Sequence, residues 1–238
     1  MKLLAVFLLV LSSLEIGAVA QTEVDLGTAN NFALLAGSGI TNTGVGTHIY
    51  GDVGSSPTPT VTGLKAYQVT GILYLEANPA TAQAQTDLTV GYNDAAGAPC
   101  GTDLTGTDLG GLTLVPGVYC FSSSAQLTGT LTLDAGGNPN AQWIFQMGST
   151  LTTASGSDVS IVLGHHPKSL WSGGLEGCNV YWQVGSSATL GSGSLFRGII
   201  LASASITLNG GTLHGKALAS TGAISITDKE EVAGKPCS

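Results

Sequence analysis

Short runs of serine, threonine, alanine and glycine recur along the chain at a nearly fixed spacing. Three of the runs end at Thr189, Thr207 and Ser225, at intervals of 18 residues. Thr152 lies 37 residues before Thr189, close to two such intervals. A period of about 18 residues suits one coil of a three-sided β-solenoid, in which no coil can bury an apolar side alone and the coils therefore stack. The repeat predicts a mostly β fold made of stacked coils.

Six runs share this composition, and each contains one or two aliphatic residues. They are AGSGIT (36–41), SSSAQLT (122–128), MGSTLT (147–152), VGSSAT (184–189), SASIT (203–207) and TGAIS (221–225). Side chains alternate between the two faces of a strand, so the aliphatic residues are expected inside the stack and the small polar residues outside. Coils in such a stack lie about 4.7–4.9 Å apart, which would place the polar sets one above another.

One segment interrupts the pattern and predicts a helix over about residues 79–97. Pro79 suits the first turn of a helix, and Gly97 and Pro99 suit its end. Its apolar residues fall at helical spacing and form one stripe, made of Ala84, Leu88, Tyr92 and Ala95. A lone helix with one apolar stripe is expected to pack along the flank of the solenoid.

The first 20 residues have the pattern of a secretory signal peptide. Lys2 precedes an apolar run at residues 3–11, and Ala18-Val19-Ala20 predicts cleavage before Gln21. The alternative, a membrane anchor, is disfavoured because the run is too short to span a bilayer and Glu15 interrupts it. We expect a secreted, soluble, single domain at residues 21–238.

The composition limits the partners of that domain. The chain is 43% hydrophobic but only 9% charged, with 35 glycines, a balance that favours many short strands joined by tight turns. Its formal net charge of −8 and its scattered basic residues argue against a nucleic-acid partner and against an anionic membrane surface. Nothing in the sequence suggests a self-complementary apolar patch, so a monomer is expected.

The four cysteines, Cys100, Cys120, Cys178 and Cys237, form no CxxC pair, so a zinc site is not expected. An even number of cysteines in a secreted chain suggests two disulfides, with three possible connectivities. We favour Cys100–Cys120, which are close in sequence, together with Cys178–Cys237, which would fix the C-terminal segment.

No catalytic motif stands out, and we expect neither an enzyme nor a cofactor. The patterns GxSxG, HExxH and the P-loop do not occur. Polysaccharide-cleaving β-solenoids need converging carboxylates, and the pair formed by Asp103 and Asp108 is the main candidate. Asp52 is interpreted as a turn residue whose carboxylate accepts backbone N–H bonds. Two other interpretations stay open from the residues alone: a Ser/Thr surface with no binding role, and a secreted adhesin or carbohydrate-binding β-solenoid.

Several long motifs together resemble the microbial ice-binding (antifreeze) proteins of the DUF3494 type. They include VDLGTANNFALLAGSGITNTG (24–44), IYGDVGSSP (49–57), DLGGLTLVPGVYCFSSSAQLTGTLTLD (108–134), NVYWQVGSSATLGSGS (179–194) and FRGIILASASITLN (196–209). The resemblance covers nearly the whole mature chain. It implies a discontinuous right-handed β-solenoid of triangular cross-section, with one long α-helix packed along its side.

The resemblance also implies a function, which is adsorption to the surface of an ice crystal through one flat side of the solenoid. Thermal hysteresis and inhibition of ice recrystallisation would follow. The expected ice-binding residues are Ser38, Gly39, Thr41, Ser124, Ser149, Thr150, Thr152, Ser187, Ala188, Thr189, Ser205, Thr207, Thr221, Gly222 and Ser225. The sequence departs from the family near its C-terminal end, where Lys229, Glu230 and Glu231 would disturb such a side if they lay on it.

Overall fold

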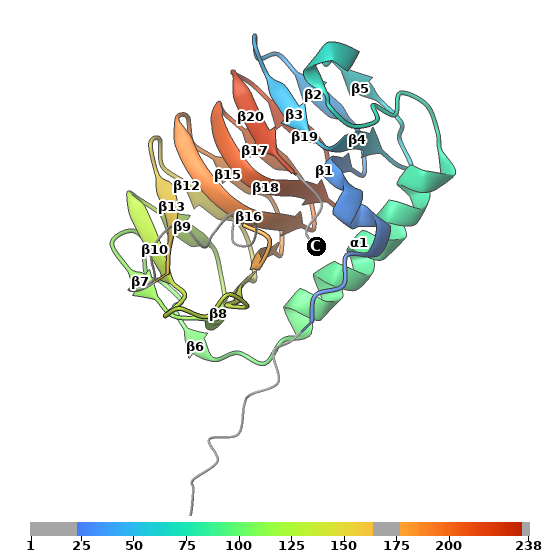
Figure 1. The fold of residues 1–238 in the computed structure, drawn as a ribbon. Coiled ribbons are helices and arrows are strands. Elements are labelled where there is room, and N and C mark those ends of the chain that lie inside the picture. Colours follow the sequence, from blue (N-terminus) through green and yellow to red (C-terminus); the bar gives the residue numbers. More distant parts are fainter. Residues whose placement is uncertain (1–22, 164–176, 235–238) are drawn as a thin grey trace, which may run out of the picture.

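The computed structural model describes residues 23–163 and 177–234, which form a stack of coils with one long helix along its side (Figure 1). Every pairing between named strands is parallel. Parallel strands that follow one another with only short turns between them require the chain to wind in coils. The predicted β-solenoid is therefore confirmed.

The stack has three sides, and one of them is a sheet of seven short strands, here called the seven-stranded side. In spatial order its strands are β5 (Val61–Thr62), β2 (Ile40–Asn42), β19 (Ile224–Ile226), β17 (Ile206–Leu208), β15 (Ala188–Leu190), β12 (Leu151–Thr153) and β9 (Ala125–Leu127).

The other two sides belong to one larger sheet. The helix-covered side contains β4 (Asp52–Ser55), β1 (Phe32–Ala36), β14 (Val180–Val184), β11 (Trp143–Met147), β8 (Gly117–Phe121) and β6 (Thr102–Asp103). The third, here called the charged side, contains β3 (His48–Tyr50), β20 (Glu230–Ala233), β13 (Asp158–Val162), β10 (Thr130–Asp134) and β7 (Thr113–Leu114).

Two nine-residue strands, β16 (Ser194–Ala202) and β18 (Gly211–Ala219), run through both of these sides. They turn the corner at Gly198 and Gly215, which are paired with each other and have φ values of +122° and +154°. A side chain on Gly215 would strike the backbone of Gly198, so the corner needs glycine in both coils.

The order of the coils in space differs from their order in sequence. Strands β1, β2 and β3 pair with β18, β19 and β20, so the first coil of the chain stacks on the last. The chain then returns along the outside as helix α1 and starts the main stack at the opposite end, near β6 (Figure 1). This arrangement confirms the discontinuity that the family resemblance implied.

Helix α1 spans Pro79–Gly97, which coincides with the predicted range. Asn78 caps its first turn by accepting a 2.9 Å hydrogen bond from the backbone N of Ala80. Ala84, Leu88 and Ala95 are fully buried. They pack on apolar side chains that project outward from the helix-covered side: Leu35, Ile144, Tyr181, Ile199, Leu201 and Leu218.

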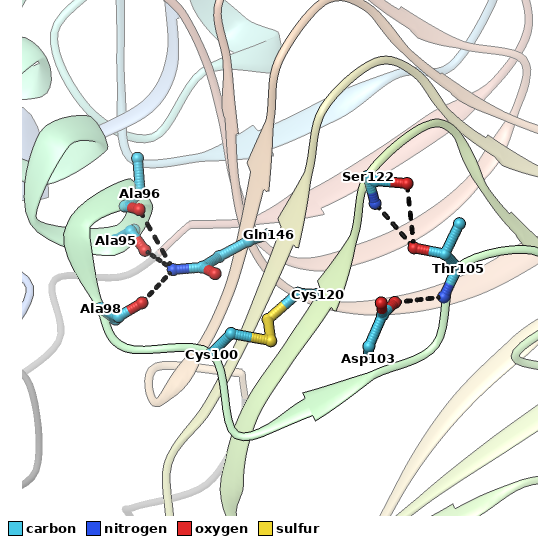
Figure 2. The surroundings of a disulfide bond; sticks show 9 residues. All are labelled: Ala95, Ala96, Ala98, Cys100, Asp103, Thr105, Cys120, Ser122 and Gln146. Carbon is cyan, nitrogen blue, oxygen red and sulfur yellow. Dashed lines mark hydrogen bonds between the residues drawn. A yellow bond between two sulfur atoms is a disulfide. The ribbon is translucent and has the colours of Figure 1, made fainter.

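Two contacts fasten the C-terminal end of α1 to the stack (Figure 2). The predicted disulfide Cys100–Cys120 joins the chain just after the helix to β8. Beside it, Gln146 Nε2 donates to the carbonyl oxygens of Ala95 at 2.8 Å and Ala98 at 2.7 Å. Cys178 is also disulfide-bonded. Its predicted partner, Cys237, lies outside the described residues, so that pairing stays a prediction.

Aliphatic and aromatic side chains fill the inside of the stack. Tyr119, Phe145, Trp182 and Phe196 come from successive coils, and their ring centroids are 5.5, 4.1 and 4.9 Å apart in that order. Trp143 and Trp182 are fully buried. The predicted signal peptide lies outside the described residues. Within them, no helix has the length and apolarity needed to span a membrane.

Candidate functional site

The middle residue of each three-residue strand on the seven-stranded side and Thr62 of the two-residue β5 point outward, and these residues align in a single row. Cα register pairs each member with the next in the order Gln126, Thr152, Thr189, Thr207, Ser225, Thr41 and Thr62. We call this set the central row. With the usual strand spacing of about 4.8 Å, its seven positions extend over about 29 Å.

The local sequence explains why this row faces outward. Six of the seven central residues stand between two buried residues, most of them aliphatic, for example Ile206 and Leu208 on either side of Thr207. Those aliphatic neighbours are buried, and they hold the short strand in one register because a slip of one residue would expose them. The position between them is therefore forced toward solvent.

Most hydroxyl groups of the central row have no protein partner. Those of Thr152, Thr189, Thr207 and Ser225 make no hydrogen bond with any residue that the structure describes. Only at the end of the row does a link appear, where Thr62 Oγ1 donates to Thr41 Oγ1 at 3.3 Å. The row thus presents evenly spaced groups that can still donate to and accept from water.

A second row, the flanking row, lies two residues earlier on each coil. Its members are Ser124, Thr150, Ser187, Ser205, Ala223, Gly39 and Thr60. Here the hydroxyls bond to neighbouring coils. Thr150 Oγ1 donates to Ser124 Oγ at 2.9 Å, and Ser205 Oγ accepts from the backbone N of Ala223 at 3.2 Å. These hydroxyls fasten coil to coil.

The structure divides the predicted site residues among three positions. Thr41, Thr152, Thr189, Thr207 and Ser225 lie in the central row, and Gly39, Ser124, Thr150, Ser187 and Ser205 lie in the flanking row. Ser38, Ser149, Thr221 and Gly222 lie in the turns that lead into the seven-stranded side, where stacked backbone bonds such as Ser38 N to Gly222 O at 3.1 Å link the coils.

Two predicted site residues need correction, because Gly39 in the flanking row and Ala188 are both buried. Ala188 occupies the first position of β15, next to Thr189, and its side chain is fully buried. Because side chains alternate along a strand, Ala188 must face the core when Thr189 faces solvent. It cannot belong to a contact surface.

The sequence analysis did not predict two members of the central row, Thr62 and Gln126. Thr62 lies in the run TVT at 60–62, which repeats the spacing of TLT at 150–152 and could have been found from it. Gln126 occupies the central position of SSSAQLT, where its long side chain hides the equivalence with threonine.

The seven strands carry no charged and no aromatic residue. Lys229, Glu230 and Glu231, which would disturb such a surface, lie beyond β19, and β20 belongs to the charged side. The C-terminal departure from the family pattern therefore leaves this surface intact.

The acidic residues considered for catalysis act as hydrogen-bond acceptors in turns. Asp103 accepts from the backbone N of Thr105 at 2.8 Å, and the hydrogen bonds with Thr105 lower the pKa of its carboxyl. Burial opposes ionisation of Asp108, but hydrogen bonds from Gly110 and Thr128 outweigh it and lower its pKa. Asp52 accepts a backbone N–H as expected, from Ile72 at 2.8 Å, but it lies at the start of β4 and not in a turn.

A hollow of about 420 Å³ opens beside the disulfide, away from the seven-stranded side. Tyr92, Gln146 and Gln183 line it together with Asp103, its one carboxylate. A pair of converging acids is absent from this lining. Elsewhere in the described ranges, no group of three or more His, Cys, Asp or Glu side chains is placed to hold a metal ion.

The sequence and the fold also match known proteins. The profile of the family described as ice-binding-like matches residues 34–232. The chain belongs to this family. An ice-binding protein of Nostoc sp. (strain HG1) is 48% identical over 217 residues, which cover 90% of this chain and 76% of the relative.

Solved structures of ice-binding proteins share the fold of this family member. One from an Antarctic biological consortium has a TM-score of 0.78 and 40% identity, covering 90% of this chain and 92% of that chain. Another, from an Arctic yeast, has a TM-score of 0.76 and 31% identity, covering 89% and 94% of the two chains. The family resemblance and the solenoid fold are both confirmed.

Proposed function

We propose that this ice-binding-family protein adsorbs to ice crystals through its seven-stranded side, with the central row at the centre of the contact. One observation carries the proposal: residues from seven strands align in a single uncharged row, and most of its hydroxyls have no partner among the described residues. The family membership and the ice-binding relatives support the same function.

The chemistry of the row suits a crystal of water. Threonine is stiff at χ1, so holding its hydroxyl and methyl groups in place costs little conformational entropy. A preorganised surface loses little further freedom on binding. Water held between evenly spaced hydroxyls and methyls could take an arrangement that joins the crystal. Adsorbed protein would then curve the growing ice front and lower its freezing point.

The flanking row and the turn residues Ser38, Ser149, Thr221 and Gly222 would form the edge of the contact. This mode of action requires no catalytic group. We further propose that the protein acts outside the cell as a monomer, without a nucleic-acid or membrane partner. Ala188 and Gly39 are left out of the proposed contact because they are buried.

Freezing-point hysteresis and crystal shape, measured in a nanolitre osmometer, test the proposal. Thr207→Tyr and Thr41→Tyr place a bulky ring on the central row, and we expect each to abolish most of the hysteresis. Thr212→Tyr is the matched control. Thr212 follows Thr207 closely in the chain and is partly exposed, but it lies on the charged side, in β18.

Each outcome decides one part of the proposal. Hysteresis that survives Thr207→Tyr and Thr41→Tyr but falls with Thr212→Tyr would move the contact to the charged side. A folded wild-type protein without hysteresis or crystal shaping would reject ice binding. Binding of polysaccharides would then be measured, since the adhesin or carbohydrate-binding alternative predicts it.

A further inference from the structure

The proposed ice-binding side is assembled from two segments that lie near opposite ends of the sequence. Strand β19 pairs with β2, so Ser225 and Thr41 are neighbours in the central row. No short turn connects these two coils, because the chain between them forms α1 and the whole main stack. Their register therefore depends on contacts across the junction.

Near both ends of β2, the backbone of the first coil lies directly against the backbone of the last coil. A Cβ atom on Gly37 would lie 2.5 Å from the carbonyl oxygen of Ser220, and one on Gly44 would overlap the carbonyl group of Asp228. Glycine at both positions lets the first coil approach the last one closely. Close approach sets the distance between the coils, and backbone hydrogen bonds from Thr43 N to Ile226 O and from Ile224 N to Gly39 O pair β2 with β19.

At one edge of the seven-stranded side, the side chain of Thr43, which directly follows β2, adds to these backbone bonds. Its Oγ1 donates to the carbonyl oxygens of Thr227 at 3.2 Å and Ile226 at 3.3 Å. Thr227 Oγ1 in turn donates to Asn209 Oδ1 at 2.9 Å. Side-chain hydrogen bonds thus link three successive coils along one edge of the seven-stranded side.

The opposite edge has no such link at the junction. The hydroxyls of the flanking row bond from coil to coil as far as Ser205, whose Oγ accepts from the backbone N of Ala223. The next two members of that row, Ala223 and Gly39, have no hydroxyl group. Thr43 therefore links the two coils at the junction, as the serines of the flanking row link coils within the main stack.

We propose that Thr43 is a positioning residue of the ice-binding side. By holding β2 in register on β19, its hydroxyl keeps Thr41 and Thr62 in line with the five residues that the main stack contributes to the central row. This inference rests on the proposed function and assigns to Thr43 a role that requires no contact with ice. Without the link, the row would divide into a segment of five positions and one of two.

Thr43→Val removes the hydroxyl with almost no change of shape, and we expect lower hysteresis from a protein that is still folded at the temperature of the assay. The amides of Thr43 and Ile224 bond across the junction to Ile226 O and Gly39 O. Their hydrogen exchange should become about tenfold faster, the effect of losing one hydrogen bond of ordinary strength. Thr43→Ser keeps a hydroxyl and should retain wild-type values.

The matched control is Thr89→Val on helix α1. Thr89 Oγ1 also donates to a backbone carbonyl, that of Gln85 at 3.0 Å, but lies away from the seven-stranded side. We expect its hysteresis to equal that of the wild type. If Thr43→Val fails to fold, Thr227→Val weakens the same linkage at the bond to Asn209 and should show the same two changes at smaller size.

Failure of this inference can be distinguished from failure of the proposed function. If Thr43→Val melts at a lower temperature but keeps full hysteresis, while Thr207→Tyr is inactive, ice binding stands and the positioning role is wrong. If Thr43→Ser is as poor as Thr43→Val, the hydroxyl is not the cause and the role is likewise wrong. A wild-type protein without hysteresis would instead reject the proposed function itself.

Discussion

The seven-stranded side and the charged side are built from the same coils, yet their surfaces differ. Both consist of parallel strands, and on both sides alternate residues of each strand face solvent. The seven-stranded side repeats uncharged residues at every level, and all of its central row except Gln126 is Thr or Ser. On the charged side, Asp158, Leu195, Thr212 and Glu231 succeed one another in a single row.

The difference concerns order as well as charge. On the charged side, Arg197 reaches Asp158 with 3.4 Å between Nη1 and Oδ1, and the same nitrogen donates to the carbonyl of Val159 at 2.6 Å. Such side chains satisfy one another and organise their own hydration. The solenoid scaffold alone therefore does not make an ice-binding surface, because a repeat must also place the same small group at each level.

The largest effect that this comparison predicts comes from a single charge. We expect Thr189→Lys to remove most of the hysteresis, since a flexible ammonium group would hold its own water in the middle of the central row. Ser160→Lys on β13 is the matched change on the charged side and should leave hysteresis unchanged. Both variants should keep their stability within about 0.5 kcal/mol, as is usual for surface substitutions.

Equal losses of hysteresis in the two lysine variants would contradict the distinction between the sides. The loss would then depend on the net charge of the protein and not on the position of the added lysine.

The second prediction concerns Glu230, which is only 2% exposed at the corner between the two sides. Burial raises the pKa of its carboxyl from 4.5 to about 7, although a hydrogen bond from the backbone of Gly210 opposes the shift. Stabilisation is complete below pH 4.5 and is lost as the pH rises through about 7, because ionisation puts an unpaired charge in the corner.

Glu230→Gln should remove this pH dependence. Above pH 7 we expect the variant to exceed the wild type in free energy of unfolding by on the order of 2–3 kcal/mol, with little difference at pH 4. Urea unfolding at the two pH values measures it. Hysteresis of both proteins should stay level with pH, because the strands of the seven-stranded side carry no titrating group. If the wild-type hysteresis falls at high pH, ionisation of Glu230 affects the seven-stranded side as well.

The smallest expected effect is a gain. Gln126 is the one member of the central row with a long flexible side chain, and its Nε2 donates to Thr128 Oγ1 at 3.2 Å. Gln126→Thr should raise hysteresis modestly by extending the row of stiff hydroxyl-bearing residues to β9. Gln126→Ala separates the two causes, since it removes the glutamine without adding a hydroxyl. If both variants gain equally, mobility of the glutamine is the factor that limits the row.

Local patterns were enough to predict much of this molecule. The interval of 18 residues from Thr189 through Thr207 to Ser225 specified the coil, because equal chain lengths per turn bring equivalent residues to the same height. The apolar stripe of Ala84, Leu88 and Ala95 specified the helix and its buried face. Alternation along each strand also predicted most of the outward residues, and its neglect at Ala188 produced a misplaced site residue.

The tertiary structure alone decided which coils are neighbours. Nothing in the spacing of β2 or β5 indicates that they stack on β19, since pairing between distant segments leaves no local period in the sequence. That stacking brings Thr41 and Thr62 into the central row and gives Thr43 its partner, Thr227. The sequence by itself determined what each coil presents, whereas long-range packing determined how many coils present it together and in what order.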